Sequence, residues 1–378
     1  MRSGILSVLT ALLLCSTTIS AAAYTEPIYG DLNGDSVCNA VDATEILIEA
    51  AAIGAGTAGT FSRTQAIAAD LNGDGAVNAL DATEILLFAA AKGTGSRLTS
   101  NDYVYQLRLP VSAASVPEFS GKPYTILHDG EPYFSVSDYD VSVSFEDYAE
   151  FDSLGRCRVC VANIGQDLMP TEPRGEIGMV KPTGWHTIRY DGIVEGNYLY
   201  NRCHLIGYQL AGENANILNL ITGTRYLNVQ GMLPFEDEVA NYVHKTGNHV
   251  LYRVTPIFAG DDLVAHGVLM EGYSVEDAGE GVEFCVYCYN AQPGIEIDYA
   301  TGDSRLSEDR PVGELYFDPA VGVTFVCNTS TKKYHSLDCP ETDRIKSENR
   351  REVSNTAEEL NAMGYTRCQK CNQKEVTL

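Results

Sequence analysis

The sequence predicts a multidomain protein: an all-α unit built from a repeated loop and helix, an α+β domain with an antiparallel sheet, and a small module held by a metal. Three observations predict this. A stretch near the N-terminus returns 39 residues later, which indicates a duplicated structural unit. Between residues 156 and 290, short runs of β-branched and aromatic residues alternate with turns. Near the C-terminus, two close pairs of Cys and His residues have the spacing of a metal site.

The first 23 residues have the layout of a secretory signal peptide. Arg2 precedes an apolar stretch over residues 5–15, and three alanines at residues 21–23 offer a small-residue cleavage site. We expect the mature chain to begin near Tyr24. Every later apolar stretch is too short to span a bilayer, so we predict a secreted, extracellular protein with no membrane span.

The repeat consists of DLNGDSVCNAVDATEILIEAAA, which starts at Asp31, and DLNGDGAVNALDATEILLFAAA, which starts at Asp70. Oxygen-bearing side chains occupy positions one, three, five, nine and twelve of each copy, which is the spacing of an EF-hand calcium loop. We therefore predict two Ca²⁺ sites. Position six is Gly75 in the second copy but Ser36 in the first, where we expect some strain in the turn. The predicted calcium ligands are Asp31, Asn33, Asp35, Asn39 and Asp42 in the first loop, and Asp70, Asn72, Asp74, Asn78 and Asp81 in the second.

Each loop leads into an apolar helix, expected over residues 43–52 and 82–92. This pair of loop-helix units, over residues 29–93, resembles a type I dockerin, and we place that domain at residues 24–95. The resemblance implies a cohesin domain of a scaffoldin as partner and attachment to a cell-surface cellulosome. The expected cohesin contacts are the tenth and eleventh loop positions, Ala40 and Val41 with Ala79 and Leu80. The alternative is a calcium-stabilised helical pair without a partner, but exposed apolar loop residues favour an interface.

The most informative run of the chain extends from Asn201 to Glu236 and reads NRCHLIGYQLAGENANILNLITGTRYLNVQGMLPFE. Hydrolysis of a phosphodiester needs a base for water, a hard cation on the phosphate and a fixed positive charge. His204, Asn228 and Arg202 can supply these in turn, with the Asn amide oxygen as a ligand for Mg²⁺. Taken alone, a His in an apolar strand is more often a hydrogen-bonded core residue.

Residues 124–304 resemble the DNA/RNA non-specific endonucleases with a ββα-metal, or His-Me finger, active site. The family signature Asp-Arg-Gly-His stands here as Asn201-Arg202-Cys203-His204, and framework text such as MPTEPRGEIGMVKPTGW and GNHVLYRVTPIF also matches. The resemblance implies a ββα-metal nuclease domain, placed at residues 120–304, that cuts DNA and RNA. It assigns His204 as general base, Asn228 as Mg²⁺ ligand, Arg202 as phosphate contact, Asn219 as the residue that organises the site, and Glu236 as a carboxylate that orients water on the metal. Asn219 is open to a second reading as a turn residue, and Glu236 to one as a first-turn helix carboxylate.

The cysteines, 11 in all, do not form one obvious disulfide framework. Cys157 and Cys160, like Cys285 and Cys288, lie three residues apart in strand-like text, which sends their side chains to opposite faces. We expect each to fill a core or to pair elsewhere. For Cys203 and Cys38, a free thiol and a distant partner are both open.

The C-terminal tail carries the predicted metal site: His335 and Cys339, followed by Cys368 and Cys371. Two close pairs of N/S ligands are typical of structural zinc, because each pair takes one side of a tetrahedron. The text CNTSTKKYHSLDCPETDRIKSENR with GYTRCQKC resembles the small zinc-binding module related to the Ada DNA-repair regulator. We place this module at residues 322–374 and expect one Zn²⁺. The competing interpretation is a disulfide that involves Cys327.

Linkers are expected at residues 96–119 and 305–321, because both are rich in Gly, Ser, Thr and charge. Strands are expected over residues 156–164, 250–258 and 282–290, and a helix over residues 234–244.

Charge is the main argument against a nuclease. The net charge is −25, and most of it falls in residues 99–318, whereas nucleic-acid binders usually show a basic surface. A local patch of Arg189, Arg202, Arg225 and Lys245, or cation bridging by the metal, would resolve this. The alternatives are a cellulosomal carbohydrase, although no stretch resembles a glycosidase, and a non-catalytic nucleic-acid-binding adaptor. Because His204 and Asn228 are both present, we predict a secreted, Mg²⁺-dependent endonuclease without choosing between DNA and RNA.

Overall fold

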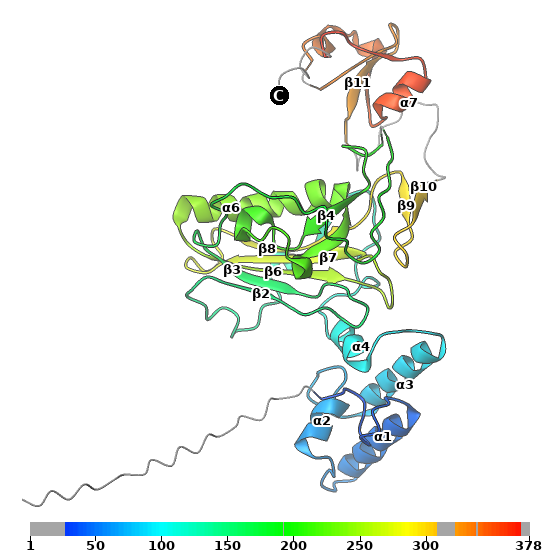
Figure 1. The fold of residues 1–378 in the computed structure, drawn as a ribbon, viewed down its shortest axis with the longest axis vertical. Helices are drawn as coiled ribbons and strands as arrows, with labels where there is room; N and C mark the ends of the chain where they lie inside the picture. Colours follow the sequence, from blue (N-terminus) through cyan, green and yellow to red (C-terminus); the bar gives the residue numbers. More distant parts are fainter. Residues whose placement is uncertain (1–26, 192, 308–321, 338, 372–378) are drawn as a thin grey trace, which may run out of the picture.

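The computed structural model describes residues 27–191, 193–307, 322–337 and 339–371. The predicted signal peptide lies outside the described residues. Helices make up the N-terminal part of the chain, a sheet with one long helix forms the middle, and a small mixed module lies at the other end (Figure 1). Within the described residues, no helix has the length and apolarity needed to cross a membrane.

The N-terminal part consists of four helices. Two long helices, α1 (Ala40–Gly54) and α3 (Ala79–Gly93), follow the two repeated loops. Along the chain, α2 (Arg63–Ala69) lies between them and α4 (Ser100–Leu107) comes after α3. Asn39 caps α1 through the amide of Val41, and Asn78 caps α3 in the same way. These caps explain why both helices begin three residues earlier than expected.

Buried apolar residues from both repeats form the core of this helical unit. Ile46 and its repeat partner Ile85 are fully buried, together with Leu71. Val104 of α4 belongs to the same core. The expectation of a linker over residues 96–119 is therefore wrong, because these residues include a helix that packs into the core.

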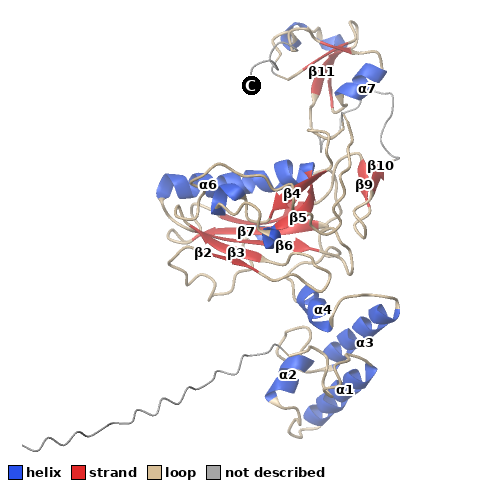
Figure 2. Cartoon of the chain, viewed as in Figure 1, coloured by secondary structure: helices blue, strands red, loops and turns tan. Residues whose placement is uncertain are grey.

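A six-stranded antiparallel sheet forms the middle domain, in the order β1-β8-β7-β6-β3-β2. Figure 2 shows these strands gathered in one layer, apart from the helical unit. The predicted strands are confirmed at their centres, although residues 156–159 precede β3 and are not part of it. The strands are β1 (Tyr124–Ile126), β2 (Phe145–Tyr148), β3 (Cys160–Ile164), β6 (Val250–Ile257), β7 (Gly267–Ser274) and β8 (Glu283–Tyr289).

The two faces of the sheet bury different clusters. Helix α6 (Leu233–Thr246), predicted within two residues at each end, packs Val239 and Val243 against one face. Residues 109–119 and Tyr133 cover the other face, which again excludes a free linker. Cys288 belongs to the first cluster and Cys285 to the second, so this pair points to opposite faces as predicted.

The other cysteine pair behaves differently. Cys157 and Cys160 belong to the same cluster, because Cys157 lies outside the strand and the alternation of a strand does not apply to it. None of the ten described cysteines forms a disulfide.

A second, two-stranded sheet lies beside the large one. In it, β4 (Tyr200–His204) pairs antiparallel with β5 (Leu220–Thr224), and the short elements α5 (Tyr208–Ala211) and η2 (Ile217–Asn219) lie between them in sequence. A π-helical segment, η3 (Leu227–Met232), leads from β5 directly into α6. This β4-β5-α6 unit is the predicted strand-strand-helix arrangement. A further hairpin consists of β9 (Ile295–Ile297) and β10 (Ser304–Leu306), and η1 is His128–Gly130.

The C-terminal module contains a four-stranded sheet in the order β13-β11-β12-β14. Cys327 lies in its apolar core with Tyr334, Val353 and Leu360, and is not part of the Cys339, Cys368 and Cys371 cluster. This separation argues against a disulfide from Cys327 to that cluster. The elements are β11 (Phe325–Asn328), β12 (Lys333–His335), η4 (Thr342–Arg344), η5 (Ser347–Asn349), β13 (Arg350–Val353), α7 (Ala357–Ala362) and β14 (Thr366–Arg367).

Candidate active site and metal centres

His204 is the last residue of β4 and is 5% exposed. Its Nε2 atom lies 2.9 Å from the backbone carbonyl of Asn214, and its Nδ1 atom lies 3.2 Å from Arg174 Nη2. A carbonyl oxygen accepts hydrogen bonds only, so the ring proton of a neutral His204 is on Nε2. The lone pair on Nδ1 then accepts a hydrogen bond from Arg174, so it can take a proton once Arg174 moves away from it.

The surroundings of His204 favour its neutral form. Burial lowers the pKa of the imidazole, and the positive charge of Arg174 adds to this effect. The hydrogen bond to the Asn214 carbonyl opposes both. A neutral imidazole is the form in which His can act as a general base.

Arg174 was not among the predicted site residues. It lies on an exposed loop that two hydrogen bonds hold: the Gly175 amide donates to Asn214 Oδ1 at 3.1 Å, and the Tyr208 hydroxyl donates to the Glu172 carbonyl at 2.7 Å. The loop is thus tied to the same Asn214 whose carbonyl fixes His204. Sequence spacing could not reveal this contact, because 30 residues separate Arg174 from His204.

Arg202, the predicted phosphate contact, is held by backbone groups and an aromatic ring. Its guanidinium donates to the backbone carbonyls of Val180 and Gly178, the latter at 2.7 Å, and lies 4.0 Å from the centre of the Trp185 ring. These contacts hold the segment before β4 against the strand. Arg202 therefore supports the strand that carries His204, and Arg174 is the arginine that contacts His204.

The two predicted asparagines occupy unlike environments. Asn219 is fully buried, and its amide bonds to both the amide and the carbonyl of Ile206, at 2.8 and 2.9 Å. It holds the chain just beyond His204 and cannot reach a substrate. Asn228 lies on η3 and is partly exposed, and its side-chain amide makes no hydrogen bond with any residue that the structure describes. An amide oxygen in that position is available to a cation.

Glu236 lies in the first turn of α6 and faces Gly207, three residues after His204. A Cβ atom on Gly207 would come within 2.5 Å of Glu236 Oε2, so any larger residue there would displace the carboxyl group. Burial, followed by the charge of Asp237, raises the pKa of the Glu236 carboxyl to about 8. The charge of Arg174 acts in the opposite direction. The structure thus brings Glu236 to the end of β4 that carries His204.

The two departures from the family signature have local explanations. Cys203 is fully buried, and a Cβ atom on Gly223 of the paired strand would lie 2.3 Å from its Sγ atom. The thiol therefore fills space that Gly223 leaves open. Asn201 pairs with Gly223 through the backbone and is partly exposed. Neither residue displaces His204 from the end of the strand.

The expected basic patch is weak. Arg189 pairs with Asp191 at 2.7 Å, and Arg225 lies 3.6 Å from Glu195. Each of these arginines has a carboxylate beside it. Arg202 and Lys245 of the expected patch, like Arg174, form no ion pair with any residue that the structure describes.

Comparisons with known families agree with this geometry. Residues 137–276 match the model described as DNA/RNA non-specific endonuclease, and residues 29–86 match the model described as type I dockerin domain. The protein carries a nuclease domain and a dockerin. It is a nuclease of the non-specific endonuclease type, and its multidomain fold is as predicted.

Several solved structures are similar to the nuclease domain. Two are crystal structures of NucA from Streptococcus agalactiae. The metal-free form is 24% identical, covers 52% of this chain and 92% of its own, and has a TM-score of 0.45. The form with a bound magnesium ion is 24% identical, covers 52% and 94%, and has a TM-score of 0.44. The Sda1 nuclease with a bound zinc ion is 23% identical, covers 50% and 97%, and has a TM-score of 0.43.

The dockerin loops have the conformation that a calcium loop needs. Asp31 accepts hydrogen bonds from the amides three and five residues further on, both at 2.9 Å, and Asp70 does the same at 2.9 and 3.1 Å. At position six, Ser36 has a φ of +65° and Gly75 a φ of +81°. The left-handed turn predicted to strain Ser36 is therefore present. The predicted oxygen side chains fit Ca²⁺ in both loops.

The C-terminal module brings its four predicted ligands together. His335, Cys339, Cys368 and Cys371 are all buried, and their ligand atoms lie within 4.8 Å of one another. Cys339 Sγ is 3.5 Å from His335 Nδ1. Three thiols and an imidazole are a donor set that suits Zn²⁺ in a closed, structural site.

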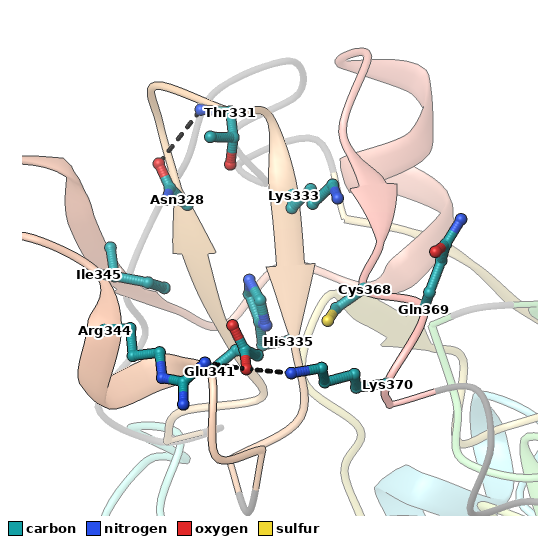
Figure 3. Close-up of a pocket in the computed structure, with 10 residues that line it drawn as sticks. All are labelled: Asn328, Thr331, Lys333, His335, Glu341, Arg344, Ile345, Cys368, Gln369 and Lys370. Atoms are coloured by element: carbon teal, nitrogen blue, oxygen red, sulfur yellow. Dashed lines mark hydrogen bonds and ion pairs between the residues drawn. The ribbon is translucent and has the colours of Figure 1, made fainter.

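A cavity of about 310 Å³ opens beside these ligands. Figure 3 shows Glu341 between Arg344 and Lys370, with both cations paired to its carboxylate. Lys333 also lines the cavity. Because one carboxylate serves two of these cations, the cavity offers a modest positive field.

Proposed function

We propose that the protein is a secreted, Mg²⁺-dependent endonuclease that hydrolyses phosphodiester bonds of DNA and RNA without strong sequence preference. The observation that carries this proposal is the fixed orientation of His204, with Nε2 on the Asn214 carbonyl and Nδ1 facing Arg174. This arrangement places a neutral imidazole, which can act as a base, next to the positive charge of a guanidinium. A carbohydrase would need two opposed carboxylates at such a point.

In the proposed mechanism, the Arg174 guanidinium moves from His204 Nδ1 to the substrate phosphate, and Nδ1 then takes a proton from a water molecule whose oxygen attacks phosphorus. The bond from phosphorus to the 3′ oxygen breaks, and by resemblance to the family the products carry 5′-phosphates. Arg174 places positive charge on the phosphate as negative charge develops there. Mg²⁺, held by Asn228, would supply further positive charge to the phosphate and the leaving oxygen. Glu236, at the same end of β4, orients water, and Asn219 and Arg202 keep the strand in place.

The test uses purified protein with supercoiled plasmid and with RNA, in Mg²⁺ or in EDTA, beside the His204→Ala variant. We expect nicking and degradation in Mg²⁺, intact substrate in EDTA, and intact substrate with the variant. Nucleic acid that stays intact under every metal tried would contradict the proposal and favour the non-catalytic adaptor. A polysaccharide panel would then test the carbohydrase alternative.

We further propose that the dockerin binds a cohesin domain of a scaffoldin and so holds the enzyme on a cell-surface cellulosome. Val41 is 55% exposed and Leu80 is 61% exposed, although both are apolar. With Ala40 and Ala79 they form two equivalent patches at the start of α1 and α3. Calcium-dependent binding to a panel of cohesins tests this, with the Val41→Asp/Leu80→Asp double variant as control. A dockerin that binds no cohesin of the panel would contradict the proposed partner.

A further inference from the structure

The two calcium loops are almost identical in sequence but differ in what contacts them. Arg108, which follows α4, donates from Nε to the Leu71 carbonyl at 3.0 Å and from Nη2 to the Asp70 carbonyl. Both carbonyls belong to the second loop. In the first loop, the carbonyl of Leu32 accepts instead from Gln65, at 3.1 Å, a residue of the dockerin itself.

Space around the loops shows the same asymmetry. A Cβ atom on Gly73 of the second loop would lie 3.1 Å from Arg108 Nε, whereas nothing lies within 4 Å of one on the equivalent Gly34. Helix α4 also reaches the chain ahead of the first loop, because Asn101 bonds to the Tyr29 amide at 2.9 Å. The Tyr29 hydroxyl in turn accepts from Arg108 at 3.1 Å. Among the described residues, however, an arginine side chain binds the backbone carbonyls of the second loop and not those of the first.

The polar side of α4 is bound to the nuclease domain. Asp102 is 3% exposed and forms an ion pair with Arg158, and it also accepts from the Ser153 amide at 3.2 Å. The Tyr105 hydroxyl accepts from the Val159 amide at 3.1 Å, immediately before β3. These contacts join α4 to residues 153–159, which lead into β3 of the six-stranded sheet.

The turn between β6 and β7 completes the junction. Asp261 accepts from the Ser96 hydroxyl and the Arg97 amide, each at 2.6 Å. The Gly260 carbonyl accepts from Gln106 at 3.3 Å and from the buried Arg156 at 2.8 Å. Ahead of and along α4, the chain is thus hydrogen-bonded to the nuclease domain at several separate points.

The apolar side of α4 is buried in the dockerin. Val104 is 2% exposed within the dockerin core, and Tyr103 packs against Phe88 with ring centres 5.5 Å apart. The Tyr103 hydroxyl bonds to Glu84 of α3 at 2.7 Å. One helix is therefore shared between the two domains, and the contacts of Arg108 tie that helix to the second calcium loop.

We propose that Ca²⁺ in the second dockerin loop is a structural cofactor of the nuclease domain, with Arg108 and α4 as the link. Arg108 can bind the carbonyls of Asp70 and Leu71 together only when the loop has its folded conformation. A ligand that stabilises one conformation also stabilises whatever depends on that conformation. Occupancy of the second loop therefore strengthens the docking of α4 on the nuclease domain, and the first loop contributes less. The inference rests on calcium binding by the dockerin and does not depend on nuclease activity.

The chain offers a natural reporter for the test. Trp185 is its single tryptophan and lies in the nuclease domain, so its fluorescence follows the unfolding of that domain alone. Thermal unfolding of the full protein would be recorded in Ca²⁺ and in EGTA. We expect the midpoint seen by Trp185 to fall by about 3 °C in EGTA. Calorimetry would confirm that the protein binds two calcium ions.

Matched variants assign the shift to one loop. Asp74→Ala in the second loop should lower the unfolding midpoint in Ca²⁺ as far as EGTA does. Asp35→Ala, the same change in the first loop, should keep most of the difference between the midpoints in Ca²⁺ and in EGTA. Arg108→Ala should remove the calcium dependence while calcium still binds, and Arg63→Ala on α2 should change nothing.

Three results would overturn the proposal. The first is a Trp185 midpoint in the unaltered protein that does not respond to calcium. The second is an equal effect of Asp35→Ala and Asp74→Ala. The third is a full calcium shift in Arg108→Ala. Loss of plasmid cleavage is not the readout, so a protein without nuclease activity would still give a result.

Discussion

The two sites at the ends of β4 and β12 use opposite kinds of chemistry. Around His204, the structure gathers an imidazole whose surroundings favour its neutral form, one exposed arginine and one carboxyl, and the amide of the predicted metal ligand Asn228 makes no hydrogen bond with any described residue. In the C-terminal module, four buried N/S atoms lie within 4.8 Å of one another. The first site includes an exposed arginine and a partly exposed asparagine, whereas four buried protein ligands make up the second.

This difference suits the first site to catalysis and the second to stabilising the fold. A hard cation with few protein ligands can bind phosphate oxygens and exchange them, which turnover requires. A closed set of three thiols and an imidazole has no position for a substrate, and its metal stabilises the fold around it. We therefore expect changes at the first site to alter chemistry with little effect on folding. Changes at the second should do the reverse.

The largest expected effect is that of His204→Ala. Removal of the base should lower the rate of plasmid cleavage by about 10³-fold, because general base catalysis contributes on that scale. The matched control is His244→Ala, an exposed histidine on α6 whose loss should leave the rate unchanged. Equal rates for His204→Ala and the unaltered protein would remove His204 from the mechanism.

Arg174→Ala should have the next largest effect. Loss of the charge that faces His204 Nδ1 should slow cleavage by about 10²-fold, as for the loss of one donor to a transition state. Arg189→Ala is the control, since that arginine is paired with Asp191. A larger loss for Arg202→Ala, with normal folding, would return the phosphate contact to Arg202.

Asn228→Ala should change the metal requirement more than the maximum rate. We expect the Mg²⁺ concentration for half-maximal cleavage to rise on the order of tenfold. Asn248→Ala is the control, because the side-chain amide of Asn248 donates a hydrogen bond to the Tyr242 hydroxyl at 3.0 Å. An unchanged Mg²⁺ titration for Asn228→Ala would place the metal elsewhere.

The pH dependence tests the orientation of the imidazole. Burial and Arg174 lower the pKa of His204 below its ordinary value of 6.5, so cleavage should fall on acidification only below pH 6.5. Removal of Arg174 takes away a positive charge, which makes protonation easier and raises the pKa. The NMR titration of His204 in metal-free Arg174→Ala should therefore move to higher pH. An unchanged or lower midpoint would contradict the contact, as would flat activity from pH 5 to 8.

Cys368→Ser should have the smallest effect on cleavage. We expect loss of bound zinc and a lower unfolding midpoint for the module, with most of the cleavage rate retained. Cys327→Ala in the same module should keep its zinc, because Cys327 lies in the apolar core. Bound zinc that survives Cys368→Ser would contradict the proposed ligand set.

Much of the molecule could be predicted from its sequence because the informative residues are close together in the chain. Both calcium loops, the helix that contains Pro234 and the strands around residues 160, 250 and 285 depend on local spacing and periodicity. The four C-terminal ligands also come as two short pairs, so their cluster was predictable. The charge argument did not exclude a nuclease, because net charge does not describe one site.

The remainder depends on contacts between distant segments. Residues 96–119 have the composition of a linker, yet α4 and the following segment are buried against two domains. Arg174 contacts His204 only because Asn214 and Tyr208 hold its loop. Arg202 has the position of a phosphate contact in the signature, and two of its donors bind the nearby carbonyls of Val180 and Gly178. Tertiary packing decides each of these cases, and the spacing of neighbouring residues in the sequence does not reveal contacts between distant segments.

The most direct test of the account compares cleavage rate and bound zinc in the same preparations of the unaltered protein, His204→Ala and Cys368→Ser, at saturating Mg²⁺. The account predicts that His204→Ala loses cleavage and keeps its zinc. It predicts that Cys368→Ser loses its zinc and keeps most of its cleavage. Cleavage by His204→Ala at the unaltered rate, or its loss in Cys368→Ser to the same extent as in His204→Ala, would contradict the account.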